Sequence, residues 1–309
     1  MARPVAATDK RSTSADGAGS AALVLVAPTI FLMLWSGGYA VAKIALKHVE
    51  PFTLLSLRYG CALLILLPLF LILRPPVPQR SAQLGHIMFV GFLIQCVYFG
   101  LSYVSFWLGA SAGAVALIVS LQPIVVGILA PLFVAERVTV WRWIGLLLGL
   151  AGAGLVIGSR SAVDAGSLWG VLAAVGALFG MSTAAIYEKR FGINAHPVTS
   201  NVLQYGIGFA MLTPIALQIE TYRVAWDLEF LAALAYLVVG NSLIALTLLL
   251  AMIRRGEASR VSALLFLVPP LAALIAWALV GEVMPPIAWA GLALAAVGVA
   301  LATRFGSAR

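Results

Sequence analysis

The chain has 309 residues, of which 62% are hydrophobic and only 10% are Asp, Glu, Lys or Arg. A soluble domain carries about 25% charged residues, so this composition excludes a soluble enzyme, a disordered chain and a nucleic-acid-binding protein. The net charge of +8 comes mainly from basic residues between long apolar segments, where such residues indicate membrane topology.

A helix needs about 20 apolar residues to cross a bilayer. Residues 1–21 are polar, and we expect them to form a disordered cytoplasmic tail. Ten long apolar segments follow, at residues 22–46, 53–73, 83–107, 110–134, 140–158, 167–190, 198–218, 228–252, 258–280 and 286–304. Continuously apolar runs favour helices over barrel strands. We therefore predict an all-α integral membrane protein with ten transmembrane helices.

The basic residues predict the orientation of these helices. With a cytoplasmic N-terminus, fourteen of the 19 Lys and Arg residues lie on the inner side, four lie on the outer side, and Arg58 lies within a span. An excess of basic residues marks the cytoplasmic side. Both termini, including the short tail 305–309, are thus expected in the cytoplasm, and the protein in the cell (inner) membrane.

The chain also repeats itself when it is shifted by 146 residues. Many uncommon residues then coincide, including Pro51 with Pro197, Tyr59 with Tyr205, Pro123 with Pro269, Glu136 with Glu282, and Trp143 with Trp289. We predict a first five-helix repeat at 22–158, an outer linker at 159–166, and a second repeat at 167–304. Because five is odd, the repeats have opposite orientations in the membrane, as in alternating-access carriers.

Each repeat has an acidic residue at the end of its fourth helix, followed by a glycine-rich fifth helix. These features read Ala135-Glu136-Arg137 before Gly145 to Gly158, and Gly281-Glu282-Val283 before Gly291 to Gly298. With the duplication, they resemble the ten-helix EamA-type branch of the drug/metabolite transporter superfamily over residues 22–304. The resemblance implies a carrier of small metabolites, similar to the amino-acid exporters. We interpret the glycines as a helix-packing surface within the scaffold or in a dimer, and the two glutamates as capping or pairing groups.

Polar residues within membrane spans are costly and are therefore candidates for function. Two helices carry polar stripes at steps of three and four residues, which share one helical face. The substrate-binding candidates on these two helices are Trp35, Ser36, Tyr39, Lys43, Gln95, Tyr98, Ser102 and Tyr103. The alternatives are that Lys43 snorkels to the membrane interface and that the small polar residues only join helices.

Four further candidates lie on other helices: Arg58, Gln122, Gln204 and Asn241. Arg58 keeps its charge at any workable pH, so we expect it to attract a substrate carboxylate, unless it snorkels or pairs with Glu50. Asn241 corresponds to Gln95 under the shift, and the two amides suit a shared midplane site. Pro123 and Pro269 are expected either to bend their helices as gating hinges or to form static kinks.

These patterns predict a secondary transporter that exports small metabolites, amino acids above all, by alternating access. The sequence places no acidic residue at mid-membrane depth, which favours facilitated transport or exchange over proton coupling. Drugs, sugars and nucleosides are alternative substrates, and an intramembrane enzyme is a weaker alternative. We expect no catalytic residue, cofactor or metal. The expected partners are a small-molecule substrate and the lipid bilayer. We expect the protein to be a monomer or a weak homodimer.

Overall fold

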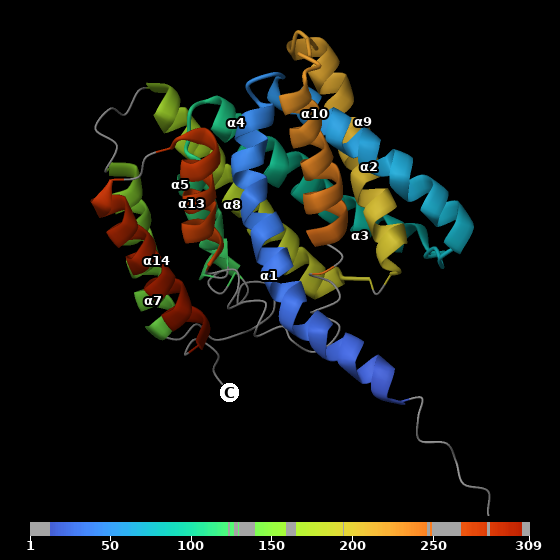
Figure 1. The fold of residues 1–309 in the computed structure, drawn as a ribbon, viewed down its shortest axis with the longest axis horizontal. Coiled ribbons are helices and arrows are strands. Elements are labelled where there is room, and N and C mark those ends of the chain that lie inside the picture. The colour runs from blue at the N-terminus through green and yellow to red at the C-terminus, as the bar shows by residue number, and fades with distance from the viewer. Residues whose placement is uncertain are drawn as a thin grey trace, which may run out of the picture.

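The computed structural model describes residues 13–122, 124–126, 129, 140–158, 165–193, 195–245, 248, 267–282 and 285–304. Every regular element in this part of the chain is a helix (Figure 1). The elements are α1 (Thr13–Ala45), α2 (Pro51–Leu73), α3 (Ser81–Gly91), η1 (Phe92–Tyr98), α4 (Phe99–Trp107), α5 (Ala112–Ser120), α7 (Val140–Gly158), α8 (Ala165–Phe191), α9 (Pro197–Ile219), α10 (Leu228–Ala235), η2 (Tyr236–Ala245), α13 (Val268–Val280) and α14 (Pro286–Arg304).

Five helical stretches of the described chain are long and apolar enough to cross a membrane, which fits a multi-pass membrane protein. They are Pro51–Leu73, Ser81–Trp107, Leu168–Phe191, Pro197–Ile219 and Leu228–Ala245. Large apolar side chains such as Leu64, Ile72 and Ile219 lie exposed on the outside of the bundle. Patches of this kind are rare on soluble monomers, and lipid would cover them.

The helices begin and end where local sequence requires it. Ser111 accepts a hydrogen bond from the backbone of Ala114 at the start of α5, and Asp227 accepts one from Phe230 at the start of α10. Both satisfy donors that a helix leaves free in its first turn. Gly281 caps the C-terminal end of α13, and its φ of +69° suits glycine.

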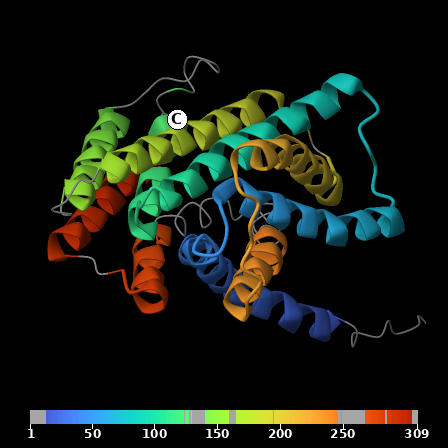
Figure 2. The same ribbon diagram turned by 90° about the horizontal axis from the view of Figure 1, so that it is seen from above.

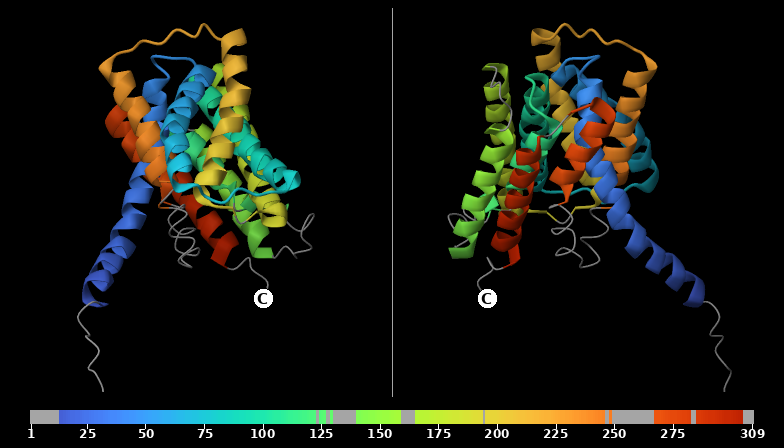
Figure 3. Two further views of the ribbon diagram at one scale, coloured as in Figure 1. Left: turned by 90° about the vertical axis from the view of Figure 1, so that its right-hand side faces the viewer. Right: turned by 60° about the vertical axis from the view of Figure 1, so that its left-hand side comes forward.

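Two differences from the expected helices have physical reasons. The helix α1 begins at Thr13, within the segment assigned to the tail, and its N-terminal end projects from the bundle (Figures 1 and 3); the alanines at positions 18 and 21 favour helix. Pro269, expected to bend a helix, lies instead in the first turn of α13, where its missing N–H costs no helical hydrogen bond. Pro123 lies outside the described residues.

Helices from the two halves of the chain pack together. α2 packs against α9, and α7 against α14, while α1 packs against α13 and η2, and α8 against α4, η1 and α5. Figure 2 shows α8 running beside the α3–α4 stretch, and the right-hand view of Figure 3 shows α7 beside α14.

Small residues allow the close approach of α7 and α14. A Cβ atom placed on Gly152 would lie 2.5 Å from the carbonyl oxygen of Gly291, and one on Gly298 would lie 2.7 Å from that of Gly145. The glycine-rich surface therefore packs within the chain, which agrees with the scaffold interpretation.

Helices α2 and α9 are also tied by polar contacts near their ends. Glu220, just after α9, accepts hydrogen bonds from the backbone N–H groups of Phe52 and Thr53 at the start of α2, at 2.8 and 2.7 Å. Glu50 in turn accepts from the backbone and hydroxyl of Thr221, at 2.6 and 2.8 Å. At the opposite ends, the hydroxyl of Thr199 donates to the carbonyl of Pro76 at 3.1 Å.

Candidate substrate-binding site

Arg58 on α2 is the centre of a buried polar cluster. Its side chain is fully enclosed, with 1% of its surface exposed. Its Nε donates to the Ser242 hydroxyl at 2.9 Å, and one terminal nitrogen donates to the Asn241 side-chain oxygen at 2.9 Å. The other terminal nitrogen donates to the Tyr103 hydroxyl at 2.8 Å. All three acceptors are neutral, and Arg58 forms no ion pair with any described residue.

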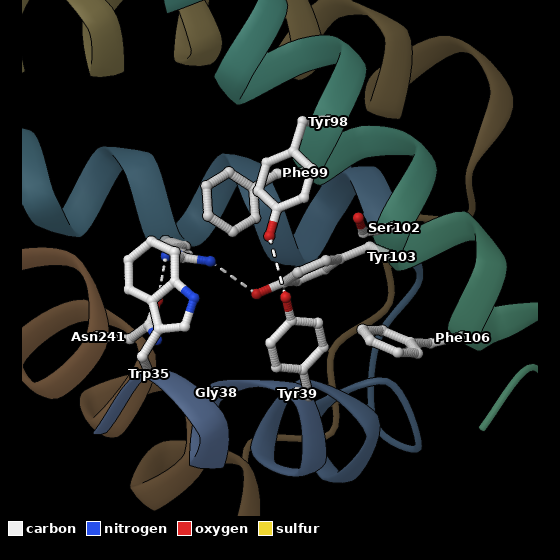
Figure 4. A pocket seen from close by; sticks show the side chains of 10 residues that line it. Trp35, Gly38, Tyr39, Tyr98, Phe99, Ser102, Tyr103, Phe106 and Asn241 are labelled. Atoms are coloured by element: carbon white, nitrogen blue, oxygen red, sulfur yellow. Dashed lines mark hydrogen bonds between the residues drawn. The ribbon is translucent and has the colours of Figure 1, made fainter. Parts of the chain in front are cut away.

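Arg58 lines a cavity of about 340 Å³, including its opening. The lining residues come from α1, α2, η1, α4 and η2, and they are Trp35, Gly38, Tyr39, Arg58, Tyr98, Phe99, Ser102, Tyr103, Phe106 and Asn241 (Figure 4). The cavity thus combines one cation, several hydroxyl or amide groups and aromatic walls.

The aromatic residues have a definite arrangement. Figure 4 shows the hydroxyl groups of Tyr39 and Tyr98 pointing toward one another, and they share a hydrogen bond of 3.4 Å. The ring of Phe106 meets Tyr39 edge to face, with centroids 6.3 Å apart. The guanidinium carbon of Arg58 lies 4.5 Å from the centre of the Phe99 ring, close enough for a cation–π interaction.

Lys43 does not line this cavity. Its ammonium group forms an ion pair with Glu282 and donates to the carbonyl of Ala110 at 3.0 Å. Glu282 also accepts from the backbone of Ala112 at 3.1 Å. These contacts join the ends of α1, α5 and α13 at what we call the Lys43 end of the bundle. For Glu282 they correspond to the expected pairing and capping role; Glu136 lies outside the described residues.

Two π-helical segments flank the cluster at positions related by the 146-residue shift. Residues 92–98, which form η1, correspond to 238–244 within η2. The Tyr59 hydroxyl donates to the carbonyl of Gln95 in η1 at 2.8 Å, and the Tyr205 hydroxyl donates to the carbonyl of Ser242 in η2 at 3.3 Å. π-Helical turns within α-helices are frequent at functional sites.

The structure brings together seven of the twelve predicted site residues, namely Trp35, Tyr39, Arg58, Tyr98, Ser102, Tyr103 and Asn241. The other five are Lys43, Ser36, Gln95, Gln122 and Gln204, and they are not among the cavity-lining residues. Ser36 and Gln95 are buried, and Ser36 Oγ and Gln95 Oε1 have no hydrogen-bond partner among the described residues. Gln122, beyond the end of α5, and Gln204 on α9 are half-buried.

One alternative for Arg58 is wrong. Glu50 does not pair with it, because the Glu50 carboxylate binds Thr221 at the end of α9. Snorkelling is also excluded, because partners from α4 and η2 enclose the guanidinium.

Gly38, Phe106 and Ser242 belong to the site although the sequence patterns did not predict them as site residues. Gly38 admits the Asn241 amide, since a Cβ atom there would lie 2.5 Å from Asn241 Nδ2. The Gly37-Gly38 pair could have indicated a close helix contact at this position, because small residues allow helices to approach closely. Ser242 directly follows Asn241, but a contact with Arg58 across 184 positions has no local signature.

Comparison with known proteins identifies similar chains over nearly the whole length. The EamA-like transporter family matches residues 20–158 and again residues 168–304. A solved crystal structure, titled only "Crystal structure of protein", shares the fold with a TM-score of 0.62 at 20% sequence identity; the similarity covers 91% of this chain and 96% of that one.

Similar curated proteins are also named as transporters. The uncharacterized transporter YvbV of Bacillus subtilis is 28% identical, with 77% of each chain covered. A probable amino-acid metabolite efflux pump of Salmonella typhimurium is 24% identical over 87% of this chain and 91% of its own. A probable terminal-alkyne amino-acid exporter of Streptantibioticus cattleyicolor is 28% identical over 62% of this chain and 64% of its own.

Proposed function

Because the chain belongs to the EamA-like transporter family, and is therefore a membrane transporter rather than an enzyme, we propose that it exports small metabolites that carry a carboxylate, amino acids above all. Arg58 carries this proposal. We further propose that the protein lies in the cell (inner) membrane with both termini in the cytoplasm, as the distribution of its basic residues supports.

A buried guanidinium whose partners among the described residues are all neutral is well suited to receive an anion. Burying a charge without compensation is costly, and a bound carboxylate would offset it. Arg58 has five N–H groups, three of which donate to described residues. A carboxylate would use the remaining donors, and the hydrogen bonds between two charged groups are strong.

The other cavity residues would orient the substrate. Asn241 and Tyr103 hold the guanidinium in place, and the hydroxyls of Tyr39 and Tyr98 add further hydrogen-bonding groups. Trp35 and Phe106 contribute apolar walls, which suit an amphipathic substrate. Lys43 has Glu282 as its ion-pair partner, so we assign it to closing the Lys43 end rather than to binding the carboxylate.

Alternating access between inverted repeats is the proposed mechanism. Two helix pairs support the inverted relation, because each joins helices whose positions differ by 146 residues: α2 packs against α9, and α7 packs against α14. Tyr59 and Tyr205 are also 146 residues apart, and each hydroxyl donates to a backbone carbonyl in the π-helical segment of its own half of the chain.

We propose that transport is facilitative or an exchange. Proton-coupled carriers commonly use ionisable relays within the membrane, and the cavity lining includes no Asp, Glu or His among the described residues. Concentrative uptake into sealed vesicles that an uncoupler abolishes would contradict this part of the proposal.

The experiment is solute flux into proteoliposomes with a panel of labelled amino acids, sugars and cationic drugs. We expect the wild-type protein to transport amino acids, and we expect Arg58→Ala to reduce this flux at least about tenfold. The control Arg80→Ala, which changes an exposed arginine, should leave the flux unchanged. Flux of sugars or cationic drugs alone would instead support the alternative substrates. Unchanged amino-acid flux in the Arg58→Ala protein would refute carboxylate recognition by Arg58.

A further inference from the structure

We infer that the cavity selects for net negative charge: among ligands with the same apolar tail, it binds the monocarboxylate anion more tightly than the zwitterionic amino acid. The inference rests on the proposed function, since it assigns the same carboxylate to Arg58. It adds an order of affinity within the carboxylates that the proposed function names: aryl- or alkyl-substituted carboxylic acids without a free ammonium group bind more tightly than amino acids with the same tail.

Charge balance in the cavity favours an anion. Among the ten lining residues, Arg58 is the one charged side chain, and its hydrogen-bond partners are two hydroxyls and an amide oxygen. A bound monoanion neutralises the site. A zwitterion brings no net charge, and it leaves one positive charge uncompensated in a low-dielectric cavity, which is unfavourable.

The hydrogen-bond donors around the cavity also favour a carboxylate. The Tyr103 hydroxyl accepts from Arg58, so its own proton is directed elsewhere. Tyr39 and Tyr98 share one hydrogen bond, which uses one of their two protons and leaves the other as a donor. Ser102 lines the cavity with 3% of its surface exposed, and its hydroxyl has no partner among the described residues. Guanidinium and hydroxyl donors match a carboxylate.

Within the part of the chain that the structure describes, Glu282, Glu50 and Glu220 are all engaged by other groups. An α-ammonium group needs acceptors or an opposite charge. Glu282 is engaged by Lys43 and Ala112, while Glu50 and Glu220 bind the ends of α9 and α2. Aromatic faces remain as weaker cation–π acceptors, but the Phe99 face already lies against Arg58.

The test compares three ligands with one shared ring: hydrocinnamate, L-phenylalanine and phenethylamine, which carry a carboxylate, both groups and an ammonium, respectively. Their affinities are measured by calorimetry on the full-length wild-type protein in lipid nanodiscs at neutral pH, so the result does not depend on a variant that folds. We expect hydrocinnamate to bind at least about tenfold more tightly than L-phenylalanine, and phenethylamine to bind most weakly.

A variant pair separates this inference from the proposed function. Arg58→Gln should remove the preference for hydrocinnamate, whereas Arg80→Gln should retain it. If L-phenylalanine binds wild-type protein as tightly as hydrocinnamate and both need Arg58, the charge-selection inference is wrong and the proposed function stands. If neither affinity changes in Arg58→Gln, carboxylate recognition by Arg58 fails, and the proposed function fails with it.

Discussion

The rings of Tyr59 and Tyr205, 146 residues apart in sequence, lie together in the core with their centroids 5.6 Å apart. Each hydroxyl reaches a backbone carbonyl in a π-helical segment of its own half of the chain. The ring pair therefore connects the two segments that adjoin the Arg58 cluster.

This contact predicts unequal effects of removing the two hydroxyls. Tyr59→Phe deletes the shorter hydrogen bond, 2.8 Å against 3.3 Å for Tyr205, and the loss of one such buried hydrogen bond costs about 0.5–1.5 kcal/mol. We expect Tyr59→Phe to lower the melting temperature of the purified protein more than Tyr205→Phe does. Equal melting temperatures in both variants and the wild type would show that the hydroxyls contribute nothing.

Removing the carboxylate of Glu282 should loosen the Lys43 end of the bundle. Glu282→Ala leaves a largely buried ammonium, with 17% side-chain exposure, without its partner, and the expected cost is about 3 kcal/mol. The control is Glu229→Ala: Glu229 is half exposed and pairs with Lys47 at 4.0 Å and with His48 at 3.2 Å, and pairs of an exposed carboxylate contribute under about 1 kcal/mol. Thermal unfolding monitored by tryptophan fluorescence compares the two variants, and a larger loss in Glu229→Ala would contradict the assignment.

A side chain at Gly152 should separate α7 from α14. Its Cβ atom would lie within 2.7 Å of the backbone at Gly291 and Ala295, and backbone atoms cannot move aside locally. Gly152→Ala should therefore destabilise the protein by about 1–3 kcal/mol. Gly85→Ala is the matched control, since no atom lies within 4 Å of the position that its new methyl group would take. Retention time and thermal stability by size-exclusion chromatography measure the outcome, and a Gly152→Ala protein as stable as wild type would refute the close contact.

The glycine beside the Asn241 amide offers a functional test that leaves Arg58 in place. Gly38→Ala would displace the amide, because the new methyl would lie 2.5 Å from its nitrogen, and Arg58 would lose an acceptor. We expect KM for a carboxylate substrate in proteoliposomes to rise about tenfold, the cost of roughly one charge-assisted hydrogen bond. Gly100→Ala, with its nearest neighbour at an ordinary 3.7 Å, should leave KM unchanged; a similar rise in both variants would point to a general packing defect.

The sequence predicted the helices better than it predicted the site. Apolar length alone placed a helix at 286–304, where α14 lies, and at 53–73, where α2 begins two residues earlier. Gln95 does not line the cavity, and α-helical periodicity could not predict this. It lies in the π-helical segment η1, where steps of three and four residues no longer share one face as they do in an α-helix, and its Cβ lies against Gly208 of α9.

The surroundings of Arg58 illustrate a second limit. Its position within a span made it a candidate, but its partners lie 45, 183 and 184 positions away. Only packing of α2 against α4 and η2 brings them together. Local patterns therefore identified the cation and several of its neighbours, while the choice between a membrane-interface role and a buried one depended on tertiary structure.

The hydrogen bonds between α2 and α9 bear on how the Arg58 charge responds to the membrane voltage. Hydrogen bonds hold this pair at both ends, and Arg58 lies on α2 between them. In an alternating-access cycle, the helices around the pair would move while the guanidinium kept its depth. The Arg58 charge would then not itself be carried across the membrane when the empty carrier returns, so any voltage dependence of that step would come from other charges or from a redistribution of the field around Arg58.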